Sequence, residues 1–287
     1  MPLTLIKGSY RVVGTQPDGD SVRFYPTDVD AFHKTKIAAQ QNAQGGVQLR
    51  LDAIDALETH YTPRVAGGHH QHQPLGLAHE AADELLRLLG FTGVQRADNE
   101  TLTAATPDRT DGYILTKFAD KYGRPVSLAY PGTAAEDDLA DVFLDIARLR
   151  ESVNHQLTAA GLVYPTFYSQ FFPDLRGALT EAADEARSKG SGVWAQDTTT
   201  TGTQVTVTSL SDTAVILPKL FRRLADYLAL NDGSTSLAGF KEFLAARDDR
   251  VLILTAGHFT GFDFVVDVDG DTVRLASPPE DLVFVEG

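Results

Sequence analysis

Apolar and polar residues alternate along parts of the chain in the pattern of half-buried β-strands. In 47–54, Val47, Leu49 and Leu51 fall on one side of an extended segment and Arg50 falls on the other. We therefore expect a strand here that turns Arg50 away from the core. β-Branched and aromatic residues, with turn residues between them, predict further strands at 3–13, 21–25, 112–118 and 125–130, of which the last two form a hairpin.

Other segments repeat their apolar residues at helical spacing. In 74–89, Leu77, Ala81 and Leu85 share one helix face, and Gly90 ends the pattern. The same criteria predict helices at 137–150, 154–160, 172–189, 219–230 and 237–246. The polar stretch 26–46 indicates a long loop or a short helix, and we make no assignment for 97–111.

The best candidate for a domain boundary is the Thr-rich run 198–203, which contains Gly202. It divides the chain into a domain at 1–197 and a small domain of mixed α/β structure at 204–287. In the second domain we expect a strand at 204–210 and two or more strands after residue 251. Its sequence resembles no family that we can name. Self-association, binding of a protein partner, and covering a site on the first domain are open roles for it.

Composition and charge limit the possible functions. The chain has 287 residues, of which 43% are hydrophobic, as in an ordinary globular protein. It has no Cys, which excludes disulfides, thiolate metal sites and Cys nucleophiles. A net charge of −14 repels nucleic acid at long range, so a nucleic-acid function needs a local basic or metal-neutralised site. Without a visible signal segment or an apolar run of about 20 residues, we expect a cytoplasmic protein with no membrane contact; a secreted mature form is the alternative.

Three separated clusters carry the candidate chemistry. They are the turn 18–21, which reads DGDS, the segment 50–59, and the loop 120–124, which reads DKYGR. Carboxylate oxygens suit Ca²⁺, and the planar fork of arginine matches two oxygens of a phosphate. Taken singly, each cluster has an ordinary explanation, as a tight turn, a solvated strand arginine and a hairpin loop. Their order along the chain is what points to function.

In that order the clusters resemble the thermonuclease (staphylococcal nuclease-like) family. Its pattern is a DGDT turn, an arginine followed five residues later by Asp and eight later by Glu, and a DKYGR loop. Arg50, Asp55 and Glu58 keep both intervals, and 120–124 matches the loop outright. The resemblance covers roughly 5–197, including a Val-Asn and Gly-Leu segment at 153–162 and a long helix followed by a tryptophan. Ser21 stands where the family has Thr, and Leu57 where it usually has Pro.

The resemblance implies an α+β fold in which helices pack on an OB-like five-stranded β-barrel. It also implies a Ca²⁺-dependent, largely sequence-nonspecific nuclease that cleaves DNA or RNA and leaves 3′-phosphate ends. By position, the catalytic residues would be Arg50, Glu58 and Arg124, and the Ca²⁺ ligands would be Asp20, Asp55 and the backbone carbonyl of Ala56. Nucleic acid would be contacted by Lys121, Tyr122, Tyr164, Phe167 and Tyr168. For the last three aromatic residues, packing on the barrel rim is as good an explanation as stacking on a base.

Two other functions remain open beside the nuclease. One is a catalytically silent module of the same fold that binds nucleic acid or protein. The other is a nuclease that acts as the effector arm of an interaction domain at 204–287. The loop histidines His69, His70 and His72, with His60 and His79 nearby, are a weak candidate for a transition-metal site, because their spacing fits no standard one.

Overall fold

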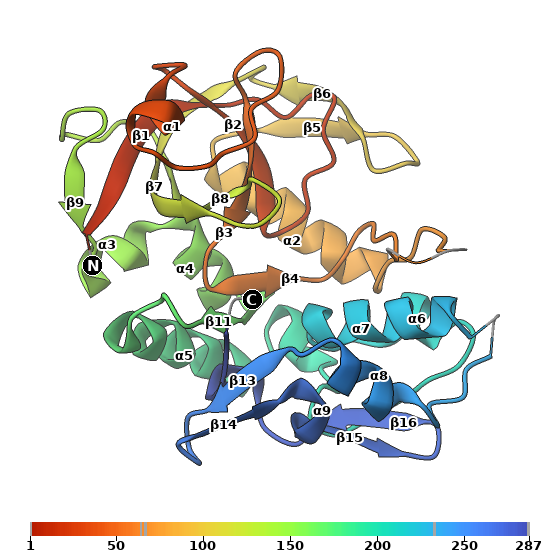
Figure 1. Cartoon of the computed structure of the whole chain (residues 1–287). Helices are drawn as coiled ribbons and strands as arrows, with labels where there is room; N and C mark the ends of the chain where they lie inside the picture. The colour runs from red at the N-terminus through yellow and green to blue at the C-terminus, as the bar shows by residue number, and fades with distance from the viewer. Residues whose placement is uncertain (1, 64, 66–67, 232–233, 286–287) are drawn as a thin grey trace.

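A computed structural model describes residues 2–63, 65, 68–231 and 234–285 of the chain (Figure 1). Residues 1, 64 and 66–67 of the predicted first domain and residues 232–233 and 286–287 of the predicted second one lie outside this description. The early strands form a barrel, and the C-terminal elements gather on one side of it, with α7 facing β4. Among the described residues, no helix combines the length and the apolar character that a membrane crossing requires.

A closed five-stranded barrel forms the first half of the fold. Its strands are β1 (Pro2–Tyr10), β2 (Ser21–Pro26), β3 (Val47–Leu51), β7 (Thr110–Ala119) and β8 (Pro125–Pro131). They pair in the circular order β1-β2-β3-β8-β7 and return to β1, and only the β3–β8 pair is parallel. The predicted α+β class with a five-stranded barrel is therefore confirmed, and the pairing is consistent with an OB-like barrel.

The alternating pattern at β3 has the predicted result. Leu49 and Leu51 are fully buried in the barrel core, together with Val22 and Ile114 of neighbouring strands, and Arg50 is partly exposed on the other side. Because strand side chains point alternately to the two faces, the apolar residues that fill the barrel also set the direction of Arg50.

Helices and short strands surround the barrel. The helices are α1 (Ala31–Lys34), α2 (Leu75–Leu88), α3 (Ile146–Glu151), α4 (Val153–Ala159), α5 (Pro173–Ser188) and the 3₁₀ helix η1 (Gly192–Ala195). The strands are β4 (Ile54–Ala56), β5 (Gly93–Arg96), β6 (Leu102–Thr106), β9 (Asp141–Phe143), β10 (Val163–Pro165) and β11 (Phe167–Tyr168). The helices predicted at 74–89, 154–160 and 172–189 are confirmed. Residues 26–46, for which a long loop or a short helix was expected, contain the four-residue helix α1 within a mainly irregular segment, and the unassigned 97–111 belongs in part to the β5–β6 hairpin and to β7.

The helix predicted at 137–150 is wrong over most of its length. Residues Asp141–Phe143 form β9, which pairs with the start of β1, and α3 begins only at Ile146. Asp145 caps that helix, since its side chain accepts a hydrogen bond from the backbone N–H of Arg148. The hydrogen bonds offered by the edge of β1 outweighed the helical spacing of the apolar residues.

The C-terminal part is a mixture of short helices and strands. Its elements are β12 (Thr203–Gln204), α6 (Ser209–Asp212), α7 (Pro218–Ala229), α8 (Phe240–Ala246), β13 (Arg250–Ile253), β14 (His258–Gly261), α9 (Phe262–Val265), β15 (Val266–Asp269), β16 (Thr272–Leu275), the 3₁₀ helix η2 (Pro279–Asp281) and β17 (Leu282–Phe284). The helices predicted at 219–230 and 237–246 are confirmed. The strand predicted at 204–210 is wrong except at Gln204, because Thr206 and Ser209 exchange side-chain hydrogen bonds with each other's backbone N–H and start a turn.

The two parts of the chain share a hydrophobic core. Leu57 and Tyr164 from the first part are buried in one cluster with Phe221 and Leu224 of α7 and Phe284 of β17. A parallel pair of strands, β11 with β17, also joins the parts. The predicted boundary at 198–203 is itself packed: Thr199 is fully buried and bonds to the backbone of Leu217 and Leu275. The division of the chain into domains at 1–197 and 204–287 stays a prediction.

Candidate functional site

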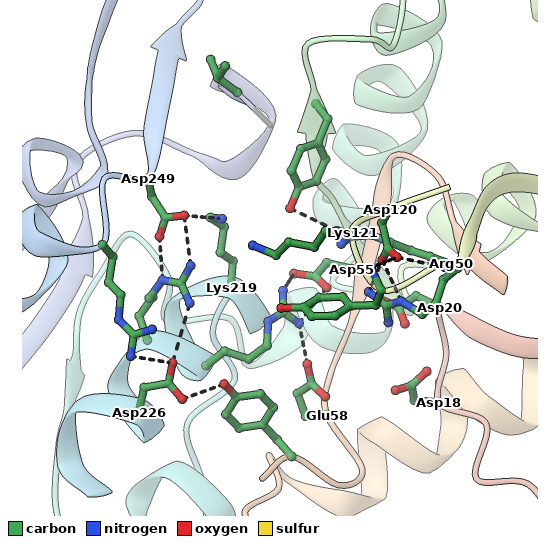
Figure 2. A pocket seen from close by; sticks show the side chains of 18 of the residues that line it. Asp18, Asp20, Arg50, Asp55, Glu58, Asp120, Lys121, Lys219, Asp226 and Asp249 are labelled. Atoms are coloured by element: carbon green, nitrogen blue, oxygen red, sulfur yellow. Dashed lines mark hydrogen bonds and ion pairs between the residues drawn. The ribbon is translucent and has the colours of Figure 1, made fainter. Parts of the chain in front are cut away.

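A pocket of about 580 Å³ lies where the barrel meets α7 (Figure 2). Its walls come from the turn before β2, from β3, β4, the β7–β8 loop and β11, and from α7 and the segment after α8. Most of the residues expected from the sequence line it, namely Asp20, Arg50, Asp55, Glu58, Lys121, Tyr122, Arg124 and Tyr168. Ala56 lies beside it on β4 and is buried, whereas Tyr164 and Phe167 are not among the lining residues.

The DGD turn enters the pocket because its glycine allows a close approach. A Cβ at Gly19 would lie 2.6 Å from the Cβ of Ala81 on α2 and 2.7 Å from that of Ala56. The turn can therefore press between helix and strand, which brings the carboxylates of Asp18 and Asp20 to the pocket wall. Asp18 is held in place by the hydroxyl of Ser21, which donates to it at 2.5 Å.

The turn between β3 and β4 is fixed from the inside of the fold. Ala53 has a φ of 63°, a left-handed conformation that reverses the chain before Asp55. The buried amide of Asn154 donates to the carbonyl of Asp52 at 2.9 Å and to that of Ser127 at 3.2 Å. α4 thereby ties β8 to this turn, and the position of Asp55 follows from that connection.

Arg50 extends from β3 toward Tyr168 of β11. One guanidinium nitrogen donates to the Tyr168 hydroxyl at 3.1 Å, and the guanidinium carbon lies 4.9 Å from the ring centre. Burial alone would raise the pKa of Tyr168, but the charges of Lys219 and Arg50 hold it below its usual value. Tyr168 therefore positions a cation in the pocket.

The β7–β8 loop is organised by Asp120. Its carboxylate accepts hydrogen bonds from the backbone N–H groups of Tyr122 and Arg124 at 2.9 and 3.0 Å, and from the Nε of Arg124 at 2.8 Å. Gly123 has a φ of 73° and lies against the backbone of Gln40, where a side chain has no room. The loop thus presents Lys121, Tyr122 and Arg124 as a preformed unit, which explains the DKYGR spacing.

Arg222 of α7 is the residue that the sequence did not point to. Its guanidinium spans both oxygens of Asp55, at 3.0 and 2.8 Å, and also donates to Glu58. The C-terminal part therefore contributes directly to the predicted catalytic site.

Further cations of the C-terminal part line the same pocket. Lys219 and Arg223 both pair with Asp249, at 3.4 and 2.6 Å, and Arg247 pairs with Asp226 at 3.4 Å. Lys219, Arg222, Arg223 and Asp226 follow one another at helical spacing. That spacing places them on one face of α7, and it was the signal in the sequence that could have identified this polar face.

The carboxyl groups of the pocket differ in their affinity for protons. Burial raises the pKa of Glu58 to about 7, although Arg222 acts against the rise. Burial and the nearby charges of Asp18 and Asp55 raise the pKa of Asp20 well above its usual value. Burial also acts on Asp55, but the charge and hydrogen bonds of Arg222 outweigh it and lower its pKa. The carboxyl group of Glu58 is therefore close to its titration midpoint at neutral pH, as general acid–base groups of enzymes often are.

Two of the aromatic residues expected to meet a base are fully buried. Tyr164 packs edge-on against Trp194, 5.1 Å between ring centres, and its hydroxyl donates to Asp197 at 2.8 Å. Phe167 stacks on Phe171 in another cluster of the core. The packing explanation applies to both, and the expected stacking on a base does not fit their burial. Tyr122, by contrast, is 43% exposed.

One of the three expected Ca²⁺ ligands is already paired with a cation. Ca²⁺ requires several oxygens at about 2.3–2.6 Å, yet both carboxylate oxygens of Asp55 accept hydrogen bonds from Arg222, which also bonds to the expected catalytic residue Glu58. Within the described part of the chain, no group of three His, Asp or Glu residues is arranged to hold a metal. Three of the histidines considered for a metal bond to separate neighbours: His70 and His72 of the loop to Thr62 and Gln73, and His79 of α2 to Glu100.

Comparison with known proteins adds no identification. No protein-family model matches the chain, and a search of curated proteins found no match. The relation to thermonucleases therefore remains a prediction from the motifs.

Proposed function

We propose that the pocket binds a phosphodiester of DNA or RNA and hydrolyses it, leaving a 3′-phosphate end, as a thermonuclease-like enzyme. The observation that carries this proposal is the convergence of Arg50, Glu58 and Arg124 in one pocket. They come from β3, from the segment after β4 and from the β7–β8 loop. The motif order alone implied that these residues act together, and the fold gives them a common cavity.

The residues of the pocket supply the needs of phosphodiester hydrolysis. Arg50 and Arg124 would bind the non-bridging oxygens of the phosphate and stabilise the charge that develops on them. Glu58, with a pKa of about 7, would orient or deprotonate the attacking water. Lys121 would contact a neighbouring phosphate. No step requires a covalent nucleophile, in keeping with a chain that has no Cys.

The pocket is less acidic than the chain as a whole. The chain carries a net charge of −14. The pocket is nevertheless lined by the cations Arg50, Lys121, Arg124, Lys219, Arg222, Arg223 and Arg247. Carboxylates line it in equal number, namely Asp18, Asp20, Asp55, Glu58, Asp120, Asp226 and Asp249, so the formal charges of the pocket cancel. The pocket is therefore locally neutral within an acidic protein, and a phosphate meets its guanidinium groups without an excess of negative charge around it. The steps proposed above use only these side chains and Glu58, and the Ca²⁺ dependence that the resemblance implies is tested separately.

One observation favours the silent binding module as a second candidate. Arg222 bonds to both Asp55 and Glu58, and a carboxylate held by a guanidinium is a weaker base for water. A pocket of this kind would still bind phosphate through Arg50 and Arg124. The two candidates agree on the ligand and differ on whether the bond is cleaved.

The test is cleavage by the full chain of labelled single-stranded DNA, duplex DNA and RNA, with Ca²⁺, with Mg²⁺ and with chelator. We expect cleavage of at least one substrate, with 3′-phosphate ends on the products. Binding without cleavage in every condition would favour the silent module, and the absence of both would refute the proposal.

A further inference from the structure

We propose that Arg222 is the resident cation of this site, bound to the expected Ca²⁺ ligand Asp55 and to the expected catalytic residue Glu58, so that the pocket holds its phosphate ligand without a metal ion. The two carboxylates are those that the motif spacing assigns to the catalytic centre. The guanidinium comes from α7, outside the range of the resemblance. The inference depends on the proposed function only for the identity of the phosphate ligand.

The contacts of Arg222 satisfy the oxygens that a cation would need. Two nitrogens bond to the two oxygens of Asp55, at 3.0 and 2.8 Å, and the first of them also bonds to Glu58. Asp55 has a side-chain exposure of 1% and Glu58 of 11%, so both charges are largely removed from water. Buried charges of this kind persist only with a partner of opposite sign, and Arg222 supplies it.

The helix that carries Arg222 is a fixed part of the core. Leu220, Phe221 and Leu224 of α7 are fully buried, in the cluster that also contains Leu57. At the pocket, the hydroxyl of Tyr61 donates to Asp226 of α7 at 2.7 Å. To make room for Ca²⁺, either α7 would leave this core or a buried guanidinium would give up both carboxylates. The packing fixes the position of α7, and the side chain of Arg222 is held on the carboxylates by its three hydrogen bonds.

The exchange of Ca²⁺ for arginine leaves the phosphate-binding groups in place. Arg50 and Arg124 are positioned by Tyr168 and Asp120, neither of which bonds to Arg222. A phosphate in the pocket would meet these two guanidinium groups and the outer edge of a third. Arginine carries its charge at every pH a protein experiences, so the site would not depend on the supply of a metal ion.

The experiment is a calorimetric titration of the full-length protein with Ca²⁺ alone, in the absence of nucleic acid. We expect no stoichiometric binding at micromolar to low-millimolar Ca²⁺ by the wild-type protein. Arg222→Ala exposes the oxygens of Asp55 and Glu58 to the ion, so its Ca²⁺ affinity should rise at least tenfold and Ca²⁺ should raise its melting temperature. The matched control is Arg223→Ala, the adjacent arginine of α7, whose partners are Asp226 and Asp249; it should gain no Ca²⁺ binding.

Stoichiometric Ca²⁺ binding by the wild-type protein with the affinity of Arg222→Ala would overturn the inference, and so would a folded Arg222→Ala that gains no affinity. If Arg222→Ala does not fold, Arg222→Gln takes its place in the titration, because it loses the charge and keeps most of the aliphatic part of the side chain. If neither variant folds, the wild-type titration decides alone. Because no substrate is present, these results are independent of whether the protein cleaves nucleic acid.

Discussion

The ion pair between Arg222 and Asp55 should contribute strongly to folding stability, because it joins the C-terminal part to the barrel through buried charges. The guanidinium meets the carboxylate with two parallel hydrogen bonds, and the side-chain exposures are 22% and 1%. We consider two substitutions that remove one charge each with little change of shape, Arg222→Met and Asp55→Asn.

The expected magnitude follows from the burial. Two unit charges about 4 Å apart interact by roughly 4 kcal/mol at an effective dielectric constant near 20. Removal of one partner from a buried pair costs about 3–5 kcal/mol, because the other charge stays buried without compensation. Glu58 also bonds to Arg222 and offsets part of the loss in Asp55→Asn. We therefore expect a coupling free energy of about 2–4 kcal/mol between the two positions.

Urea denaturation of the wild-type protein, the two single variants and the double variant measures this coupling. The control cycle uses Lys189 and Glu185, an exposed pair on α5 and its C-cap, for which the coupling should be much smaller. Additive effects of Arg222→Met and Asp55→Asn, within about 0.5 kcal/mol, would refute the reasoning. They would mean that the two charges do not meet in the folded protein.

Two further predictions concern the pocket cations and their partners. Arg124→Ala should slow cleavage by about 100- to 1,000-fold, by analogy with the loss of one donor to a developing oxyanion. The control is Arg148→Ala, which removes an ion pair outside the pocket and should cleave at the wild-type rate. Equal cleavage rates for the two variants would show that Arg124 does not act in the site. Burial would raise the pKa of Asp249, but Arg223 and Lys219 lower that pKa below its usual 3.8. The ionised Asp249 therefore stabilises the fold above pH 3.8, and this stabilisation is lost as the pH falls through the lowered pKa. Urea midpoints measured down to pH 3 should therefore fall less steeply for Asp249→Asn than for the wild-type protein, and parallel curves would contradict this assignment.

The barrel could be predicted from the sequence because its signals are local. The alternation of Leu49, Arg50 and Leu51 gives both the core face and the direction of the arginine, and the structure confirms both. The motifs at Asp20 and 120–124 also lie in the turn and loop where tight geometry was expected. In each case the reason for the residue is found within a few positions of it.

The sequence predictions were wrong or incomplete where contacts with distant parts of the chain determine the local structure or the role of a residue. The helix expected at 137–150 is interrupted by β9 at Asp141–Phe143, because β1 offers hydrogen bonds there. Arg222 was missed because its meaning depends on Asp55, which lies far away in the sequence and adjacent in the fold. The polar face of its helix was visible in the spacing of the charges, but nothing in 219–230 indicated what that face meets.

The central claim is that the pocket cleaves phosphodiesters, and the most direct measurement is the cleavage rate of a labelled single-stranded oligonucleotide by wild-type protein and by Glu58→Gln. The glutamine can still accept a hydrogen bond from Arg222, so the fold and the binding of the oligonucleotide should be kept. We predict that the variant binds like the wild-type protein and cleaves about 100- to 10,000-fold more slowly, as expected for the loss of a general base. Equal cleavage rates would contradict the assignment of Glu58, and a wild-type protein that binds the oligonucleotide and never cleaves it would contradict the claim itself.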